Sequence, residues 1–286
     1  MWMLVERPAW LLRANESAFR FYDLPLHFHG REASKSGKEA VVNLLAVIPA
    51  RYASQRFPAK PLAMIGERPM VEWVYRATVG CEVFQQVVVA TEDERIADAV
   101  KKFGGTVEMT RSDHATGTDR VAEVAARYPD AQVVANVQGD QPFVTAEMLR
   151  RLVAPYLAGE TPEMTTLACE INDPEIETDP NSVKVVCSRS MHALYFSRSP
   201  IPYYRERHDA PVYHHLGLYA FRRDFLQTYT TFAATPLEQC EQLEQLRVLE
   251  NDGRIRVSLA EKHVLEINTP EDLARAHAFV VPPLGG

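Results

Sequence analysis

The 286-residue chain has few cysteines, no disulfide pattern and no long hydrophobic run. Its four cysteines, Cys81, Cys169, Cys187 and Cys240, are far apart and form no C-x-x-C pair. Such a set makes no disulfide framework and favours reduced thiols in a cytoplasm. No segment approaches the roughly 18 apolar residues that a membrane-spanning helix needs, so we expect no membrane partner.

Two common nucleotide-binding signatures are also missing. No G-x-G-x-x-G follows the first apolar segment, and the P-loop pattern occurs nowhere, which excludes a dinucleotide-binding dehydrogenase. The formal net charge of -7 argues against nucleic acid as a partner, because nucleic-acid binders need a basic face. A small anionic ligand remains compatible with this charge, since a local cluster of arginine and lysine can oppose it.

The first part of the chain differs from the rest. Residues 1–28 mix aromatic, basic and acidic residues without periodicity, and residues 29–40 (HGREASKSGKEA) have the composition of a linker. There is no apolar segment followed by a small-residue cleavage site, as a secretory signal requires. We predict that residues 1–41 are a flexible extension without chemistry and that residues 42–286 form one domain.

From residue 42 onward, apolar segments typical of buried strands alternate with segments of helical periodicity. The expected strands are 41–48, 86–90, 106–109 and 131–138. The expected helices are 117–128, 145–157 and one that residues 91–93 cap and that runs through residue 102. This alternation predicts an α/β fold, a Rossmann-like and mainly parallel sheet with helices on both faces. Ligands of such sheets bind beyond the carboxyl ends of the strands.

The second half of the chain is less regular. Strand-like segments at 164–171, 182–188 and 212–221 predict a smaller mixed sheet, an insertion that closes over the site or pairs subunits. Residues 238–246 (EQCEQLEQL) have one apolar helical face, which predicts a continuous amphipathic helix. Residues 265–280 predict a strand, a turn at Asn268 and a helix capped by Thr269.

Polar loops follow the predicted strands at 50–61, 110–120 and 138–142, and the turn at Asn268 follows the last of them. We expect these loops to meet at one edge of the sheet, where basic side chains would face a carboxylate. That arrangement suits a nucleoside triphosphate with Mg²⁺, because the cations neutralise phosphate and the carboxylate holds the metal. The basic residues are Arg51, Arg56, Lys60 and Arg111, and the carboxylate is that of Asp140.

The loop after the first strand contains no glycine but has prolines at positions 49, 58 and 61. Phosphate-binding loops usually use glycine so that the backbone can approach the anion. Proline fixes the backbone instead, and phosphate can then be met by side chains. We therefore predict a stiff, side-chain-based phosphate site.

These segments resemble the 3-deoxy-manno-octulosonate cytidylyltransferase family, a branch of the nucleotide-diphospho-sugar transferases. The resemblance spans residues 43–279 in the correct order. It is carried by IPARYASQRFPAKPL, GGTVEMTRSDHATGTDR, NVQGDQP, VKVV, ALYFSRSPIP, HLGLYAF, LEQLRVLE and NTPEDL.

The resemblance implies an enzyme that transfers CMP from CTP to a 3-deoxy-octulosonate sugar acid (Kdo), releasing pyrophosphate, for lipopolysaccharide biosynthesis. It also implies Mg²⁺ as cofactor, a homodimer, and catalytic roles for Arg51, Lys60 and Asp140. The implied nucleotide-binding residues are Arg51, Ser54, Arg56, Lys60, Arg111, Thr116, Gly117 and Thr118. The implied sugar-binding residues are Gln138, Arg198, His215, Tyr219, Glu244 and Gln245, and the implied metal ligands are Asp140 and Asn268.

Two positions depart from the family pattern. Ala59 stands where the family usually has glycine, and if the position needs a positive φ, alanine costs roughly 1 kcal/mol. Asn268 stands where the family usually has a metal-binding aspartate, so metal affinity should be lower. Glu266 precedes it by two residues, on the same face of the expected strand, and could supply the missing charge.

Two other hypotheses remain open from the sequence. The same reaction could act on a related sugar acid, such as 8-amino-Kdo or a nonulosonic (sialic) acid. Alternatively, the loss of the aspartate at Asn268 could mark a metal-impaired homologue that only binds nucleotide.

Overall fold

The computed structural model describes residues 42–53, 57–171, 173–206 and 210–280. The predicted extension, residues 1–41, lies outside the described residues, so its flexibility and the domain limits stay predictions. The four cysteines are all described and all unpaired, as predicted. Within the described ranges, no helix has both the length and the apolar character needed to cross a membrane.

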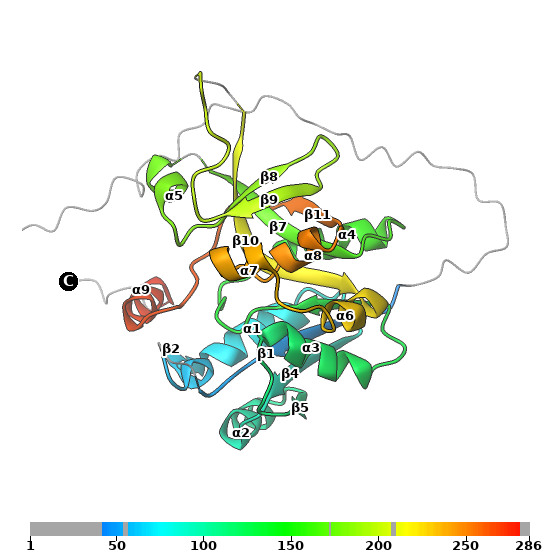
Figure 1. The fold of residues 1–286 in the computed structure, drawn as a ribbon. Helices are drawn as coiled ribbons and strands as arrows, with labels where there is room; N and C mark the ends of the chain where they lie inside the picture. Colours follow the sequence, from blue (N-terminus) through cyan, green and yellow to red (C-terminus); the bar gives the residue numbers. More distant parts are fainter. Residues whose placement is uncertain (1–41, 54–56, 172, 207–209, 281–286) are drawn as a thin grey trace, which may run out of the picture. The chain divides into compact units, whose positions relative to one another are not determined.

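A mixed sheet of nine strands forms the centre of the described fold (Figure 1). One half is parallel, as the sequence predicts, and its strand order is β6-β1-β4-β5. These strands are β1 (Leu44–Pro49), β4 (Gln86–Thr91), β5 (Val107–Met109) and β6 (Val133–Asn136). Their carboxyl ends therefore lie at one edge of the sheet, where the predicted loops begin.

The other half of the sheet is reached through an antiparallel strand. β10 (Val212–Arg222) pairs antiparallel with both β6 and β7 (Met164–Ile171), and β11 (Ile255–Leu259) runs parallel to β7. The hairpin-like arm of β8 (Lys184–Cys187) and β9 (Ala193–Ser197) extends from β10, next to the short helix α5 (Pro174–Thr178). This is the smaller mixed part that the sequence predicts.

Helices cover both faces of the sheet, because alternate residues of its strands point to opposite sides. In β1, Leu44, Ala46 and Ile48 join one core cluster, and Leu45 and Val47 join the other. The helices packed on the first face are α1 (Met70–Val79), α2 (Glu94–Lys102) and α4 (Ala146–Leu157). Those on the second face are α3 (Gly117–Ala126), α6 (Arg223–Tyr229) and α8 (Leu246–Glu250). The predicted fold class is confirmed.

The predicted helix over residues 238–246 is wrong in its continuity. α7 (Pro236–Glu241) ends at Gln242, which has φ 55° and ψ 48°, and α8 begins only at Leu246. A left-handed residue ends an α-helix because the next amide can no longer point along the helix axis. Glu244 and Gln245 therefore lie in a turn between two short helices.

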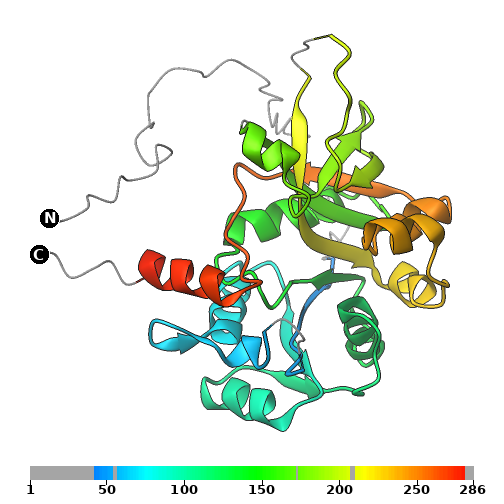
Figure 2. The ribbon, with the colours of Figure 1, turned by 60° about the vertical axis from the view of Figure 1, so that its left-hand side comes forward.

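The predicted strand at residues 265–267 is also wrong. Among the described residues this segment pairs with no strand. Ile267 N donates to Asp140 O at 2.9 Å, and Ile267 O accepts from Lys60 Nζ at 3.1 Å. Ile267 is buried with Ile65, Met70 and Ala276. The last of these lies on α9 (Pro270–Val280), which Figure 2 shows in red beside the small hairpin of β2 (Met64–Ile65) and β3 (Arg68–Pro69).

The start of α9 is capped as the sequence predicts. The backbone amide of Asp272 donates to Thr269 Oγ1 at 3.2 Å, and the amide of Thr269 donates to Asp272 Oδ2 at 2.9 Å. The amide of Asn268 donates to the same carboxylate oxygen at 2.9 Å. Asp272 thus fixes the backbone of the turn that follows Ile267, which matters for the site described next.

Candidate active site

The loop after β1 brings two of the predicted cations into the fold. Arg51 is half-buried, and its Nη2 atom is buried without a hydrogen-bond partner among the described residues. A buried N–H group without an acceptor is unfavourable, and an anion would satisfy it. Ser54 and Arg56 lie outside the described residues, so their predicted contacts with nucleotide stay predictions.

Lys60 joins three segments that are far apart in the sequence. It opens the short 3₁₀ helix η2 (Lys60–Leu62), and its Nζ lies 2.9 Å from Asp140 Oδ2 and 3.1 Å from the carbonyl oxygen of Ile267. The two side chains remain 18% and 28% exposed, so a ligand can reach them. The structure therefore brings together the β1 loop, the loop after β6 and the turn before α9.

Gly139 lets the loop after β6 pass directly over the end of β1. A Cβ atom at this position would lie 2.8 Å from the carbonyl oxygen of Pro49, closer than real Cβ atoms approach a backbone oxygen. The absence of a side chain at Gly139 is thus what allows Asp140 to reach Lys60.

Ala59, directly before Lys60, has the positive φ that the sequence analysis considered. Its φ is 57° and its ψ is 18°, the left-handed region that disfavours residues with a Cβ. We expect Ala59→Gly to raise the free energy of unfolding by about 1 kcal/mol, because glycine adopts this conformation without the steric penalty. Urea denaturation of the two proteins measures the difference. A lower stability of the glycine variant would show that the flexibility it adds to the unfolded chain outweighs the relieved strain.

Oxygen atoms of several side chains gather around Asp140. Glu266 Oε1 accepts a hydrogen bond from Gln141 Nε2 at 2.7 Å, and the Asn268 side chain also bonds to the Glu266 carboxyl. Glu266 as a whole residue is exposed to solvent, but its carboxyl group lies close to protein atoms. The lost solvation of this carboxyl and the charge of Asp140 raise the pKa of Glu266 to about 7. Gln141 Oε1 is buried and has no hydrogen-bond partner among the described residues.

This oxygen cluster is able to hold a hard divalent cation only with help from outside the protein. No group of three His, Cys, Asp or Glu side chains suited to a metal occurs within the described ranges. The donor atoms that Asp140, Glu266 and the side-chain amide of Asn268 could offer to a metal are all oxygen atoms. Mg²⁺ accepts such a set, because it is usually bound by one or two carboxylates and completes its shell with water and substrate phosphates.

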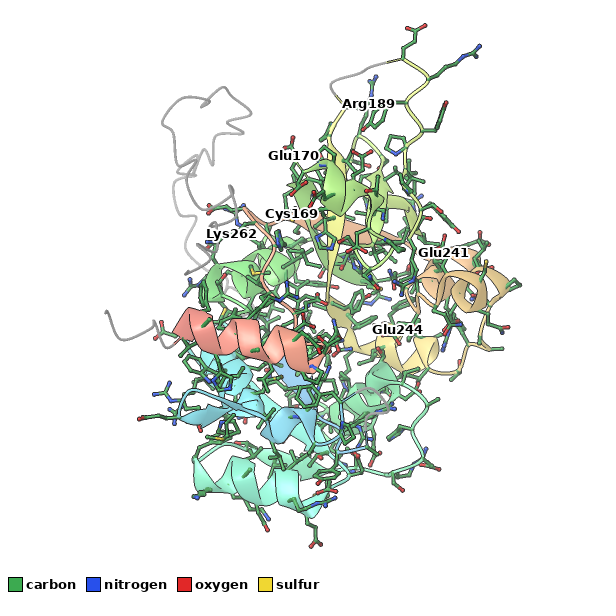
Figure 3. All side chains as sticks on the ribbon, turned by 90° about the vertical axis from the view of Figure 1, so that its left-hand side faces the viewer. Cys169, Glu170, Arg189, Glu241, Glu244 and Lys262 are labelled. Atoms are coloured by element: carbon green, nitrogen blue, oxygen red, sulfur yellow. The ribbon has the colours of Figure 1, made fainter. Side chains whose placement is uncertain are left out.

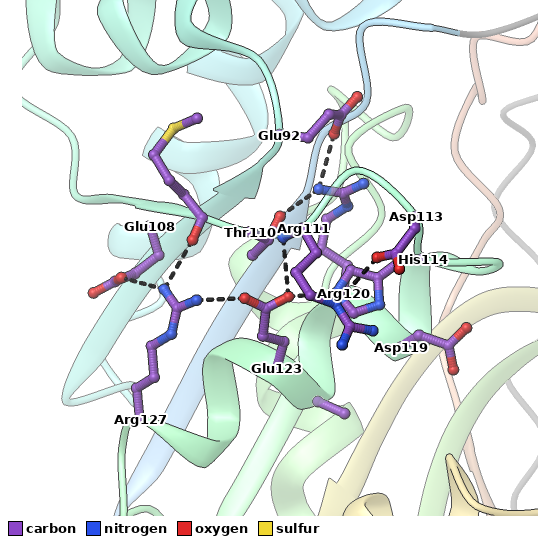
Figure 4. A network of polar contacts seen from close by, with 12 residues as sticks. Glu92, Glu108, Thr110, Arg111, Asp113, His114, Asp119, Arg120, Glu123 and Arg127 are labelled. Atoms are coloured by element: carbon purple, nitrogen blue, oxygen red, sulfur yellow. Dashed lines mark hydrogen bonds and ion pairs between the residues drawn. The ribbon is translucent and has the colours of Figure 1, made fainter.

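The segment between β5 and α3 carries the predicted Arg111 at the surface (Figure 4). Arg111 Nε lies 3.1 Å from Asp113 Oδ1, and both side chains are largely exposed. Thr116 caps α3, because its hydroxyl accepts from the amide of Asp119 and the Asp119 carboxylate accepts from the amide of Thr116. Gly117 is the first residue of α3. The predicted nucleotide contacts of these residues stay predictions.

A buried ion pair that the sequence did not predict fixes the start of the β1 loop. Arg120 is 1% exposed, and its Nη1 lies 2.8 Å from Glu92 Oε2 (Figure 4). Glu92 Oε1 also accepts a hydrogen bond from the backbone amide of Tyr52, 3.1 Å. The pair therefore connects the end of β4 and α3 to the residue that follows Arg51.

A row of hydrogen bonds leads from the loop after β6 to the turn after α7. Gln138 Nε2 donates to Asn136 Oδ1 at 3.2 Å, and Asn136 Nδ2 donates to Thr118 Oγ1 at 3.2 Å. The Thr118 hydroxyl in turn donates to Glu244 Oε1 at 2.6 Å, and burial raises the pKa of Glu244. Thr118 is fully buried, and its hydroxyl contacts the Glu244 carboxyl directly. Asn136 was missed, although a lone amide in an apolar strand is a signal that it has buried partners.

A second set of hydrogen bonds, next to Glu244 in the chain, joins three of the predicted sugar-binding side chains. The Tyr219 hydroxyl donates to Gln245 Oε1 at 3.1 Å, and Gln245 Nε2 lies 3.5 Å from His215 Nδ1. His215 Nε2 lies 2.9 Å from the Thr166 hydroxyl. An irregularity in β10 between His215 and Tyr219, where Gly217 has φ 63°, accompanies this placement. The structure thus brings His215, Tyr219 and Gln245 together.

His215 should make the protein sensitive to acid. Burial, and then the neighbouring His214, lower the pKa of His215 from 6.5 to about 3. A lowered pKa means that the stability is complete above 6.5 and is lost as the pH falls, because the unfolded chain takes up a proton first. We expect the free energy of unfolding to fall by about 2 kcal/mol more between about pH 7 and pH 5 in the wild type than in His215→Gln. Urea titrations at both pH values measure this, and equal losses would contradict the assignment.

Arg198, directly after β9, uses its guanidinium group on backbone oxygens. Its Nε donates to the carbonyl of Glu241 at 2.7 Å, and its Nη1 donates to the carbonyl of Pro180 at 3.0 Å. Figure 3 labels Glu241 near Glu244, on the segment that carries the turn. Arg198 pairs with no carboxylate through its guanidinium among the described residues. Its predicted contact with the sugar carboxylate stays a prediction.

Comparison with known proteins identifies related chains. Residues 45–256 match the cytidylyltransferase family model. The 3-deoxy-manno-octulosonate cytidylyltransferase of Acaryochloris marina is 63% identical over 239 residues, which are 84% of this chain and 98% of that protein. The enzyme of the same name from Synechococcus elongatus is 57% identical over 240 residues, with the same two coverages.

A solved structure agrees with these relatives. A CMP:2-keto-3-deoxy-manno-octonic acid synthetase, complexed with CTP, matches with a TM-score of 0.80 and 39% identity, covering 83% of this chain and 98% of that one. A 4-diphosphocytidyl-2C-methyl-D-erythritol synthase from Anaerococcus prevotii matches with a TM-score of 0.56 at 16% identity, which shows the fold alone. The chain belongs to the 3-deoxy-manno-octulosonate cytidylyltransferase family.

Proposed function

We propose that this protein transfers CMP from CTP to a 3-deoxy-octulosonate sugar acid, Kdo, and releases pyrophosphate. One observation carries the proposal: the loop after β6 joins both halves of the site. Asp140 pairs with Lys60 on the predicted nucleotide side, and Gln138, two residues away, begins the hydrogen-bonded row to Glu244 on the predicted sugar side. The relatives named for this reaction support the same assignment.

The side chains suit an in-line transfer. The anomeric hydroxyl of the sugar acid attacks the α-phosphorus of CTP and releases its proton to solvent water. The bond between the α-phosphorus and the bridging oxygen breaks, and pyrophosphate leaves with the electron pair. Arg51 and Lys60 would stabilise negative charge on the phosphate oxygens. Glu244 and Gln245 would accept and donate hydrogen bonds to sugar hydroxyls. No covalent intermediate with the protein is required.

We propose Mg²⁺ as the cofactor. The oxygen donors around Asp140 support this choice, because Mg²⁺ prefers carboxylate, amide and phosphate oxygen. When bound, Mg²⁺ neutralises charge on the phosphates and lowers the pKa of the attacking hydroxyl. The protein's own part is to position the side chains that would bind the metal. Lys60 holds Asp140, and the backbone bonds of Ile267 fix the segment that carries Glu266 and Asn268.

A substrate panel tests the reaction. The purified full chain is incubated with CTP, Mg²⁺ and Kdo, 8-amino-Kdo or a sialic acid in turn, and pyrophosphate release is followed, with the nucleotide product identified by mass spectrometry. We expect release with Kdo and a CMP-sugar of the corresponding mass. Preference for 8-amino-Kdo or sialic acid would change the substrate assignment. Turnover of none of them would leave a nucleotide-binding homologue and overturn the proposed function.

We also propose that the protein is a cytoplasmic homodimer. Two large hydrophobic side chains support an interface near the β8–β9 arm: Leu194 on β9 is 62% exposed, and Tyr203 beyond it is 89% exposed. Aromatic side chains such as Tyr203 are enriched in protein–protein interfaces, and unpaired cysteines suit the cytoplasm. Light scattering is expected to give a mass twice the 32.3 kDa of one chain, and a monomer mass would contradict the dimer.

A further inference from the structure

Asp140 and Asn268 by themselves would give a divalent cation only one carboxylate. Asn268 offers a neutral amide, and the charge of Asp140 is already opposed by Lys60 Nζ at 2.9 Å. Lys60 and Asp140 together therefore contribute no net negative charge. A cation at this position would be better held if a second carboxylate lay beside Asp140.

Glu266 is the acidic residue that the structure holds in that position. The segment around it is fixed at two points: Ile267 N donates to Asp140 O, and Ile267 O accepts from Lys60 Nζ. Its carboxylate is held by Gln141 Nε2 at 2.7 Å. Gln141 is 2% exposed and also donates to the carbonyl of Leu216 at 2.8 Å, so it cannot easily turn away.

The Gln141 side chain carries a second sign that points to a ligand. Its Oε1 is buried and lacks a partner among the described residues, while its Nε2 bonds to Glu266. A buried acceptor without a donor is unfavourable, and water molecules in the shell of a bound cation are suitable donors. Gln141 follows Asp140 directly in the chain and bonds to Glu266, so a cation near both carboxylates would be attracted by two negative charges.

We propose that Glu266 replaces the aspartate that is absent at position 268, so that its carboxylate, Asp140 and the amide oxygen of Asn268 together bind the divalent cation. The inference rests on the proposed function, because the cation is the one that accompanies CTP. Glutamate is one methylene longer than aspartate, and Glu266 comes two residues earlier in the segment that Ile267 N joins to Asp140 O. The net charge that the family pattern places at position 268 is thus kept in this chain.

Metal binding without turnover tests the proposal. Mn²⁺ serves as the probe, because free Mn²⁺ is counted directly by electron paramagnetic resonance, and the sugar acid is omitted. Titrations of the full chain with CTP compare the wild type, Glu266→Gln, Asn268→Asp and the double variant. We expect Glu266→Gln to weaken Mn²⁺ binding by about 10- to 100-fold, and Asn268→Asp to restore most of it in the double variant. Asn268→Asp alone should bind Mn²⁺ more tightly than the wild type.

Controls separate a lost ligand from a damaged fold. Glu266→Gln keeps the size of the side chain and an oxygen for Gln141, and urea denaturation checks that the variant is folded. Glu271→Gln removes the same charge from an exposed residue of α9 and should leave Mn²⁺ binding as in the wild type. Wild-type Mn²⁺ affinity in Glu266→Gln, or a loss that Asn268→Asp does not restore, would overturn the inference.

The proposed function is examined separately by CTP binding in the presence of EDTA, using calorimetry. If the wild type binds CTP but Mn²⁺ binding is the same in the wild type and in Glu266→Gln, only the role of Glu266 is refuted. Wild-type protein that binds no CTP under any of these conditions refutes the proposed function itself, and the inference with it.

Discussion

Asp140→Asn is expected to lower the turnover number of the proposed reaction by about 100- to 1,000-fold. The substitution keeps the shape of the side chain but removes its charge, so Lys60 Nζ loses the carboxylate that holds it at 2.9 Å. The proposed cation site then loses one of its two proposed carboxylates as well. Initial rates of pyrophosphate release over a range of CTP and Mg²⁺ concentrations measure the effect on kcat and KM.

The ion pair itself is tested by combining two substitutions. Lys60→Met and Asp140→Asn remove the two members of one contact, so we expect their effects to be non-additive, with the double variant close to the worse single one. Asp130→Asn is the matched control, because Asp130 is exposed at the end of the turn after α3 and lies outside the site. Its rate should equal that of the wild type. A rate for Asp140→Asn within about five-fold of the wild type would contradict the central position given to this carboxylate.

Much of the fold follows from local patterns in the sequence. Helix α2 begins where Asp93 offers a capping carboxylate, and its side chain accepts from the amide of Arg95 at 2.9 Å. Helix α4 begins after Thr145 for the same reason, with a bond from the amide of Met148 at 3.2 Å. Capping residues and apolar periodicity act over a few residues, and a sequence displays them directly.

The errors arise where a distant contact decides the local conformation. The apolar positions around Cys240 and Leu246 fit one helix, yet Gln242 takes a left-handed conformation that no propensity favours, and both Leu243 and Leu246 become buried. The gain is that Glu244 can reach Thr118, which lies 126 residues earlier in the chain. Tertiary burial thus overrides helical periodicity at the place where the site needs a turn.

The candidate site was predictable in its residue types but only partly in its connections. The sequence placed Lys60 and Asp140 at one edge, because both follow strands of a parallel sheet. It could not show that Glu92 and Arg120 form a buried pair, since nothing in their spacing of 28 positions indicates contact. Ile267 was expected in a strand because it is apolar, but its place is set by Lys60 and Asp140.

Gly139→Ala is expected to impair both stability and activity, although it adds a single methyl group. The new Cβ would lie 2.8 Å from Pro49 O, and neither partner is a flexible side chain, so the backbone of the loop or of β1 has to move. We expect the free energy of unfolding to fall by about 1–3 kcal/mol, as for other overpacked sites. Displacement of Asp140 from Lys60 should lower the turnover number as well, since misplacement by about 1 Å costs about 100-fold in other enzymes.

Gly117→Ala is the matched control for stability, because it adds the same methyl group against the same proline. There the Cβ would lie 3.6 Å from Pro49 Cγ, an ordinary van der Waals contact, at the first residue of α3. Alanine favours a helix over glycine, so this variant should be as stable as the wild type or more stable by up to about 1 kcal/mol. Urea denaturation compares the pair. If the two variants were equally stable and Gly139→Ala kept the wild-type rate, the close approach at Pro49 would not be what positions Asp140.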